Sequence, residues 1–315
     1  MTVKMRDYRW EKDFEAARAF LAEIFPIRTS YSNWIPSTLE NVKYGPGGTE
    51  YLDEEDEYLK IWEIVDEAKE DAQRIIALSY TKPSGECSLS MHPDYMSEFK
   101  AIVNWMEARV RELREEEGKG PKIAMVVDDE DEERIVLLAE LGFQKDEMEG
   151  DKQVRPLDTP IPDYTLPEGY TVRHVVIEED YREYREVQKS VFRHIVEMSK
   201  AQLQLYSRAS FYKEDLDIVA VDSKGSFAAF CTVRMDPLSK IAELEPVGTH
   251  PDHRKLGLGK AVICEGLRRL EKYNPSAMVI IGAAPSEGAR RLYESVGFVN
   301  EGTLHYWVRK LVPST

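Results

Sequence analysis

The sequence has little cysteine and no long apolar run. Its three cysteines lie far apart among 315 residues, and no CxxC pair occurs. We therefore expect neither a disulfide framework nor a zinc site, and a reducing, cytoplasmic location fits this pattern. No stretch of about 18 apolar residues is present, so no membrane span is expected. The N-terminal segment MTVKMRDYRWEKDF is more polar than a signal peptide.

Basic charge is scarce in the first half of the chain. Residues 1–150 contain 19 lysines and arginines against 35 acidic residues, whereas residues 151–315 contain 23 of each, so the first half carries the whole net charge of −16. Nucleic-acid binding is not expected, because phosphate contacts need a basic surface. The acidic runs fit solvated loops and helix ends, and they also fit a field that attracts a cationic substrate or partner.

The two halves of the chain share short sequence matches. The triplet HPD occurs at 92–94 and again at 250–252, an offset of 158 positions. The pair Gly-Phe occurs at 142–143 and again at 297–298, an offset of 155. Two matches in the same order at nearly the same offset indicate a duplicated domain.

A proline-rich segment separates the two halves. Residues 155–169 hold four prolines and few apolar residues, which is typical of a linker. We expect a first domain over 1–156, a linker over 157–169 and a second domain over 170–315. Strands are expected over 3–8, 58–65, 74–80, 87–91, 122–127, 170–175, 216–222, 226–236, 241–248, 277–282 and 305–311. Helices are expected over 99–114, 132–141, 180–192, 258–273 and 286–296.

A glycine loop opens the helix expected at 258–273. In THPDHRKLGLGKA, residues 249–261, Arg254, Gly257 and Gly259 stand where a strand gives way to a helix. A helix N-terminus has unpaired N–H groups and a positive dipole end, and glycine lets an anion approach them. Lys255 and Lys260 add positive charge, so the loop suits a diphosphate. It is neither a Walker A loop nor GxGxxG, and a simple glycine turn is the alternative.

The loop resembles a signature of the GCN5-related N-acetyltransferase (GNAT) superfamily. HRKLGLGKA is similar to the R/Q-x-x-G-x-G/A motif of that family, and ARRLYESVGF, residues 289–298, is similar to its second signature. The resemblance implies an α/β (α+β) fold of two tandem GNAT domains, each a mixed, mostly antiparallel sheet flanked by helices. It also implies acetyl-CoA as acyl donor, with no metal.

The resemblance also implies a set of cofactor-binding residues. In the family the glycine loop cradles the pyrophosphate of acetyl-CoA, and the preceding strand pairs with its pantetheine arm. Ser286 stands where the family often has an asparagine that binds this arm, and serine has a shorter reach. The expected cofactor-binding residues are Val247, Gly248, Thr249, Arg254, Lys255, Leu256, Gly257, Leu258, Gly259, Lys260 and Ser286.

The first half carries the glycine-loop pattern in an eroded form. After HPD it reads YMSEFK, residues 95–100, with neither the arginine nor the two glycines. Glu98 would lie near the phosphate position and repel it. We therefore expect a degenerate first copy that does not bind coenzyme A beside a catalytic second copy.

Candidate catalytic residues follow from the same resemblance. Tyr293 stands where GNAT enzymes often keep a tyrosine that protonates the leaving thiolate, and a packing tyrosine is the alternative. Two carboxylates in an apolar strand, Glu243 and Glu245, cost free energy unless they are paired or face a cavity. Pro246 should interrupt the strand ladder beside Glu245. Glu245 is therefore preferred as general base, with Glu243 or solvent as alternatives.

The expected function is transfer of an acetyl group from acetyl-CoA to the amine of a small acceptor. The acidic first half favours a cationic acceptor. The alternatives are a coenzyme A-binding sensor or scaffold without turnover and a structural protein without cofactor. No nucleic acid or membrane partner is expected, and both a monomer and a homodimer are open. His250 and His253 are expected to be surface or capping residues rather than metal ligands.

Overall fold

The chain divides into two compact units. The computed structural model describes residues 2–27, 30–46, 55–65, 73–116, 122–192, 198–283 and 286–311. The first unit comprises Met1–Pro36, Tyr51–Gly150 and Gly302–Thr315, and the second comprises Ser37–Glu50 and Asp151–Glu301. Three segments thus lie in a different unit from the one expected, namely 37–50, 151–156 and 302–315.

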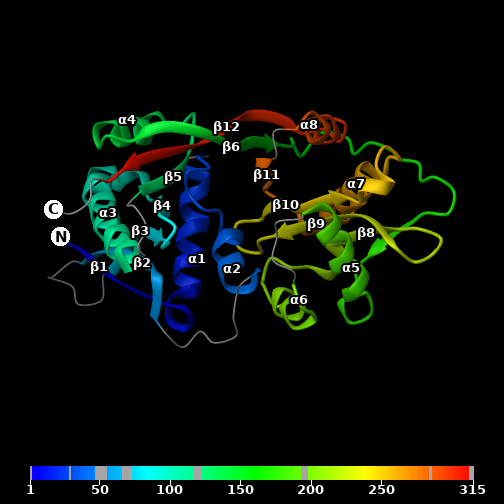
Figure 1. Cartoon of the computed structure of the whole chain (residues 1–315), viewed down its shortest axis with the longest axis horizontal. Helices are drawn as coiled ribbons and strands as arrows, with labels where there is room; N and C mark the ends of the chain where they lie inside the picture. Colours follow the sequence, from blue (N-terminus) through cyan, green and yellow to red (C-terminus); the bar gives the residue numbers. More distant parts are fainter. Residues whose placement is uncertain are drawn as a thin grey trace. The chain divides into compact units, whose positions relative to one another are not determined.

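The first unit is a mixed sheet with helices. Its strands, in spatial order, are β1 (Thr2–Arg9), β2 (Glu55–Val65), β3 (Gln73–Thr81), β4 (Glu86–Met91), β5 (Lys122–Asp128) and β12 (Val299–Lys310). All neighbouring pairs are antiparallel except β4 with β5. The helices are α1 (Trp10–Ile27), α3 (Phe99–Glu116) and α4 (Glu132–Glu140) (Figure 1). Apolar side chains of α3 pack on the sheet beside Trp62 and Leu89.

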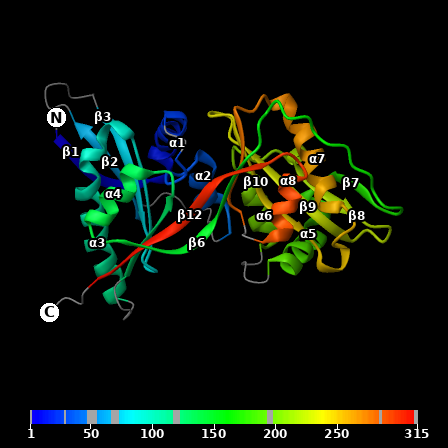
Figure 2. The same cartoon turned by 90° about the horizontal axis from the view of Figure 1, so that it is seen from above.

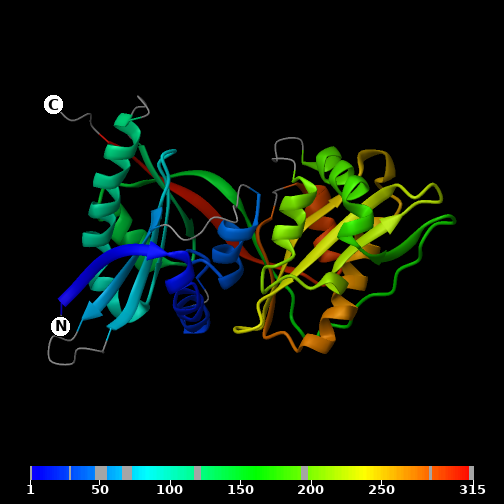
Figure 3. The same cartoon turned by 90° about the horizontal axis from the view of Figure 1, so that it is seen from below.

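The second unit has the same kind of architecture. Its strands, in spatial order, are β6 (Gln144–Val154, of which residues 144–150 belong to the first unit), β11 (Ala277–Ala283), β10 (Ile241–Thr249), β9 (Phe227–Met235), β8 (Asp217–Val221) and β7 (Thr171–His174). The helices are α2 (Pro36–Tyr44), α5 (Ile177–Val191), α6 (Lys200–Tyr206), α7 (Leu258–Leu270) and α8 (Glu287–Glu294). Helix α7 packs on one face of the sheet, and α5 and α6 pack on the other (Figures 2 and 3).

Every strand and helix expected from the sequence is present, with shifted ends. Among the α-helices and strands of the described residues, α1, α2, α6 and β6 were not expected. Strand β6 reads QKDEMEGDKQV, so it lacks the apolar alternation that identifies a strand. It pairs with β11 through Asp151, Gln153 and Val154.

The last strand does not belong to the second unit alone. Residues Leu304–Lys310 pair antiparallel with Asp128–Lys122 of β5, and Trp307 is buried in the core of the first unit. Only Val299–Glu301 of β12 lie in the second unit. The sequence predicted this strand but not its partner, because apolar alternation marks a buried face and says nothing about which edge the strand joins.

The expected linker is anchored to the second unit. Ile161, Tyr164 and Leu166 pack against the core between α7 and the sheet. The Arg155 guanidinium donates to the Val296 carbonyl at 2.8 Å and to the Thr159 carbonyl at 2.7 Å. The segment has no helix or strand, yet these contacts hold its backbone against the second unit.

The repeated HPD triplets adopt the same local structure. Nδ1 of His92 accepts a hydrogen bond from the Asp94 amide at 3.2 Å, and Nδ1 of His250 accepts one from the Asp252 amide at 3.2 Å. Each histidine caps a 3-10 turn that a proline opens, Pro93–Glu98 in one unit and Pro251–His253 in the other. The shared geometry agrees with a duplicated domain.

The three cysteines are free thiols, and all are buried. Across the described ranges, no helix is long and apolar enough to cross a membrane.

Candidate acyl-transfer site

A break in β10 opens the site. Strand β10 pairs in parallel with β11 only from Ile241 to Glu243. Its antiparallel register with β9 shifts between Leu244 and Val247, so the interruption expected at Pro246 is present. Proline has no N–H to donate to a ladder. The backbone from Glu245 to Thr249 therefore diverges from β11. Among the described residues, this part of β10 has no strand paired with it on the side that faces β11.

Two glycines let the elements around this edge approach closely. A Cβ atom on Gly248 would lie 2.6 Å from Cζ of Phe230 and 2.9 Å from Cγ1 of Val191. A Cβ atom on Gly259 would lie 3.1 Å from Oγ1 of Thr249. Strand β10 therefore lies tightly between α5 and the first turn of α7.

The loop before α7 presents an open helix N-terminus. Gly257 is the N-cap residue with φ of 79°, and no side chain caps the helix. Nothing lies within 4 Å of the position that a Cβ on Gly257 would occupy. Arg254 and Lys255 beside it are exposed. The first amides of α7 and two cations therefore face solvent together, an arrangement that suits an anion.

The residues expected to bind the cofactor belong to four parts of the second unit. They occupy the free part of β10 (Val247, Gly248, Thr249), the loop (Arg254, Lys255, Leu256, Gly257), the first turn of α7 (Leu258, Gly259, Lys260) and the start of α8 (Ser286). Leu258 is buried, and Leu256 is 40% exposed. The Ser286 hydroxyl caps α8 by accepting from the Ala289 amide at 3.2 Å, so this serine has a structural task of its own.

The charge of Glu245 acts on Tyr293. Tyr293 lies on α8, half-buried against Phe298, with ring centroids 6.0 Å apart. Desolvation by burial raises the pKa of Tyr293 far above its usual value, and the negative charge of Glu245 raises it further. The phenol therefore keeps its proton at neutral pH.

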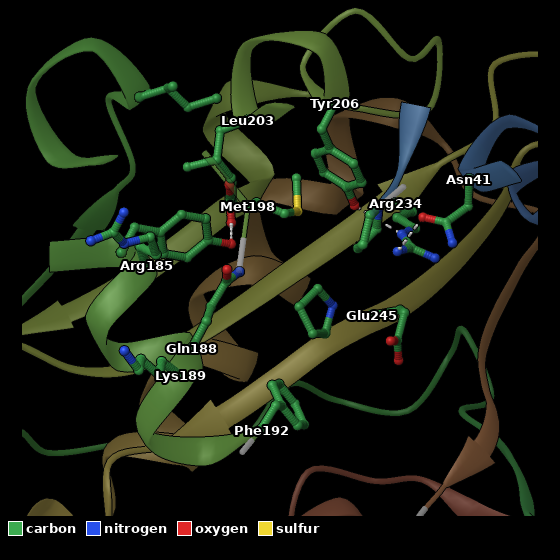
Figure 4. A pocket seen from close by; sticks show the side chains of 15 residues that line it. Asn41, Arg185, Gln188, Lys189, Phe192, Met198, Leu203, Tyr206, Arg234 and Glu245 are labelled. Atoms are coloured by element: carbon green, nitrogen blue, oxygen red, sulfur yellow. Dashed lines mark hydrogen bonds between the residues drawn. The ribbon is translucent and has the colours of Figure 1, made fainter. Parts of the chain in front are cut away.

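Glu245 lines a pocket of about 830 Å³, a volume that includes its open mouth (Figure 4). Its carboxylate is accessible from the pocket. Desolvation nevertheless raises the pKa of Glu245, with Arg234 opposing and Glu243 adding to the rise. The pocket is lined by Asn41, Pro46, Ile177, Tyr184, Arg185, Gln188, Lys189, Phe192, Met198, Leu203, Tyr206, Asp217, Arg234, Glu245 and Pro246.

Two polar side chains of the pocket have no hydrogen-bond partner among the described residues. They are the carboxylate of Glu245 and the amide of Gln188. Most of the remaining wall is apolar, with Phe192, Met198 and Leu203 among its members. The pocket can therefore take a small molecule that has a polar group near each of these two side chains.

A buried carboxylate lies behind this wall. Oδ1 of Asp217 accepts hydrogen bonds from the hydroxyls of Tyr184 and Thr232, each at 2.8 Å, and Oδ2 accepts one from Tyr212 at 3.2 Å. Desolvation raises the pKa of Asp217 to about 6, although the three hydroxyls oppose the rise. This cluster could not be predicted from the sequence, because its members are separated from Asp217 by 5 to 33 positions.

The corresponding place in the first unit is closed. Its 3-10 turn, Pro93–Glu98, leads directly into α3, and the Phe99 amide donates to the Met96 carbonyl. The Phe99 side chain is fully buried there. The glycine and the open helix N-terminus found before α7 are therefore replaced, before α3, by a packed turn.

The histidines beside the glycine loop have neighbours of their own. Nδ1 of His253 lies 2.8 Å from the Tyr170 hydroxyl, while His250 caps its turn. Over the described ranges, no group of three or more His, Cys, Asp or Glu side chains could hold a metal ion.

Comparison with known proteins shows which family part of the chain matches. Residues 176–298 match the model of the Acetyltransferase (GNAT) family. The whole chain also resembles two solved structures at 15% identity: a GCN5-related N-acetyltransferase from Sphaerobacter thermophilus (TM-score 0.64, covering 99% of this chain and 97% of that one) and a tandem GNAT protein from the clavulanic acid biosynthesis pathway (TM-score 0.66, covering 100% of both). The fold is a tandem GNAT fold, as expected from the sequence.

Curated relatives carry a more specific name. The chain is 28% identical over 150 residues to the mycothiol acetyltransferase of Paenarthrobacter aurescens, which covers 45% of this chain and 46% of the relative. It is 30% identical over 160 residues to that of Streptomyces coelicolor, covering 48% and 52%. The chain thus spans about half the length of the curated relatives it matches. Residues 176–298 of this chain are thus similar to the GNAT acetyltransferase family.

Proposed function

We propose that this protein transfers an acetyl group from acetyl-CoA to the amine of a small acceptor. One observation carries the proposal: the free edge of β10 runs from the open N-terminus of α7 to the pocket that contains Glu245. A thioester carrier lying along this edge would place its anionic end at Arg254 and its acyl end beside the pocket.

The cofactor site would use backbone and charge together. The exposed guanidinium of Arg254 and the ammonium groups of Lys255 and Lys260 would attract the pyrophosphate, and the amides after Gly257 would donate to it. Val247, Gly248 and Thr249 would pair with the pantetheine arm. The coenzyme supplies the activated acetyl group, and the protein supplies its orientation.

The reaction needs two proton transfers. The acceptor nitrogen attacks the thioester carbon, a C–N bond forms, and the C–S bond breaks. Glu245 takes the proton that the nitrogen loses, and its raised pKa makes it a better base than an ordinary carboxylate. The Tyr293 phenol gives its proton to the departing sulfur, because its own pKa keeps it neutral until then.

The acceptor would be a small amine, and a cationic one fits best. The Glu245 carboxylate lies in the pocket without a hydrogen-bond partner in the described chain, so an ammonium group can pair with it. The relatives named mycothiol acetyltransferase support an acceptor of low molecular mass. We propose that the second unit is catalytic and that the first is a degenerate copy.

The test is thiol release from acetyl-CoA with a panel of amines. We expect turnover with at least one amine, and a loss of turnover in Tyr293→Phe. The matched control is Tyr273→Phe, because the Tyr273 hydroxyl is bonded to Asp215, and Glu245 is not among the charges that act on it. Tight binding of coenzyme A without turnover, unaffected by Tyr293→Phe, would instead support a sensor or scaffold.

A further inference from the structure

Arg234 connects the acceptor pocket to a helix from the first half of the sequence. Its guanidinium donates from Nε to the Tyr206 hydroxyl at 2.9 Å and from Nη2 to Oδ1 of Asn41 at 3.1 Å. Nη1 lies 3.5 Å from Oε2 of Glu243. All three nitrogens are therefore engaged, by side chains of α6, α2 and β10.

The two glutamates of β10 have different surroundings as a result. Glu243 is the cross-strand partner of Arg234, is 8% exposed, and accepts a hydrogen bond from the Ser37 hydroxyl of α2 at 3.1 Å. Glu245, two residues later, lines the pocket and has no such partner among the described residues. Strand position alone does not distinguish them, since both belong to the same apolar strand.

We propose that Arg234 is a positioning residue for acyl transfer. Asn41 and Tyr206 hold its guanidinium, and the guanidinium pairs with the Glu243 carboxylate so that Glu243 does not accept the proton of the acceptor. Glu245 is then the one glutamate of β10 that is free to take a proton from the acceptor. The inference rests on the proposed function for its catalytic meaning. It also assigns a task to α2, whose residues Ser37 and Asn41 hold this arrangement from about 200 positions away in the sequence.

A buried guanidinium in this place controls charge as well as position. Breaking a buried ion pair leaves an uncompensated charge, so Glu243 without Arg234 would repel Glu245. The Arg234 cation lowers the pKa of Glu245 against its desolvation. Charged and titratable groups facing Glu245 or lining its pocket come from β8 (Asp217), β9 (Arg234), β10 (Glu243), α5 (Tyr184, Arg185, Lys189), α6 (Tyr206) and α8 (Tyr293).

The experiment follows the titration of Glu245 directly. In protein labelled with ¹³C at glutamate side-chain carboxyls, the signal that disappears in Glu245→Gln belongs to Glu245. In Arg234→Met we expect the titration midpoint of that signal to rise by about one pH unit. In Arg234→Lys the charge remains, so the midpoint stays near that of the wild type. A lysine cannot hold three partners as the planar guanidinium does, so KM for the acceptor should rise.

Controls separate this role from a merely structural one. Arg269→Met removes an arginine of α7 that is paired with Glu265 and does not line the pocket, so the Glu245 midpoint should not move. Asn41→Ala leaves the Arg234 charge in place. It should raise the KM for the acceptor and should shift the Glu245 midpoint only a little. An equal Glu245 midpoint in the wild type and in folded Arg234→Met would overturn the proposal.

A second variant covers the case in which Arg234→Met does not fold. Glu243→Gln removes the neighbouring negative charge and should lower the Glu245 midpoint, and an unchanged midpoint would again overturn the proposal. The measurement needs no acceptor, so its outcome is independent of turnover. Shifted midpoints in a protein that acetylates no amine would leave the role of Arg234 in place and contradict the proposed function.

Discussion

The position of a Cβ atom on Gly248 lies 2.6 Å from the Phe230 ring, closer than real Cβ atoms approach other atoms. Phe230 is fully buried between α5 and the sheet, so its ring has little room to move. Glycine at this position is therefore required by packing, and the close approach holds β10 where the coenzyme would lie.

Gly248→Ala should destabilise the second unit by about 1–3 kcal/mol, because an added methyl group overpacks this contact. Thermal or urea unfolding measures the loss. Gly288→Ala is the matched control, since nothing lies within 4 Å of its added Cβ in helix α8, and it should be neutral or slightly stabilising. Equal stability of the two variants would contradict the packing argument.

Gly257→Ala tests the anion site. The φ of 79° at Gly257 strains an alanine by about 1–2 kcal/mol, and a shift of the loop would turn the first amides of α7 away from a phosphate. We expect coenzyme A to bind at least tenfold more weakly, as measured by titration calorimetry. Gly225→Ala has a similar φ of 87° in the turn between β8 and β9, so it imposes the same local strain. Coenzyme A should bind to it as to the wild type.

The local parts of the site could be predicted from the sequence. Gly257 before an apolar helical period indicates a helix start, and Gly257 is the N-cap of α7. Pro246 indicates an interrupted ladder, and the register shift is there. Each of these features depends on residues within a few positions of one another, so spacing alone encodes it.

The walls of the pocket could not be predicted in this way. Asn41 bonds to Arg234 across 193 positions, and Tyr184 bonds to Asp217 across 33. Contacts of this kind come from the packing of whole elements, and they leave no periodicity in the chain. The same holds for β12, whose apolar pattern was evident but whose pairing with β5 was not.

Tyr293→Phe tests the general acid. Burial and the neighbouring charges keep the phenol protonated well above neutral pH, so it remains a proton donor throughout the usual assay range. We expect kcat to fall by about 10²-fold or more with little change in the KM for acetyl-CoA. The decrease should be smallest for acyl donors whose thiol is more acidic, because their thiolates leave without help. A uniform decrease across such donors would argue for a packing role.

Asp217 should make stability depend on pH in an unusual direction. Its folded pKa of about 6 lies above the unfolded value of 3.8, so the folded state binds the proton more tightly. The contribution of this group to stability is therefore fully present below pH 3.8 and is lost as the pH rises through 6. The loss amounts to about 3 kcal/mol for a shift of this size.

Asp217→Asn removes this titration. The free energy of unfolding, measured with urea at pH 4 and at pH 7, should fall less in the variant than in the wild type. Most of the difference should develop between these two values. Asp222→Asn is the control, because Asp222 lies in an exposed turn where its carboxylate accepts from the amides of Lys224 and Ser226. A wild type and an Asp217→Asn variant with parallel pH profiles would show that the carboxyl has the same proton affinity in the folded and the unfolded chain.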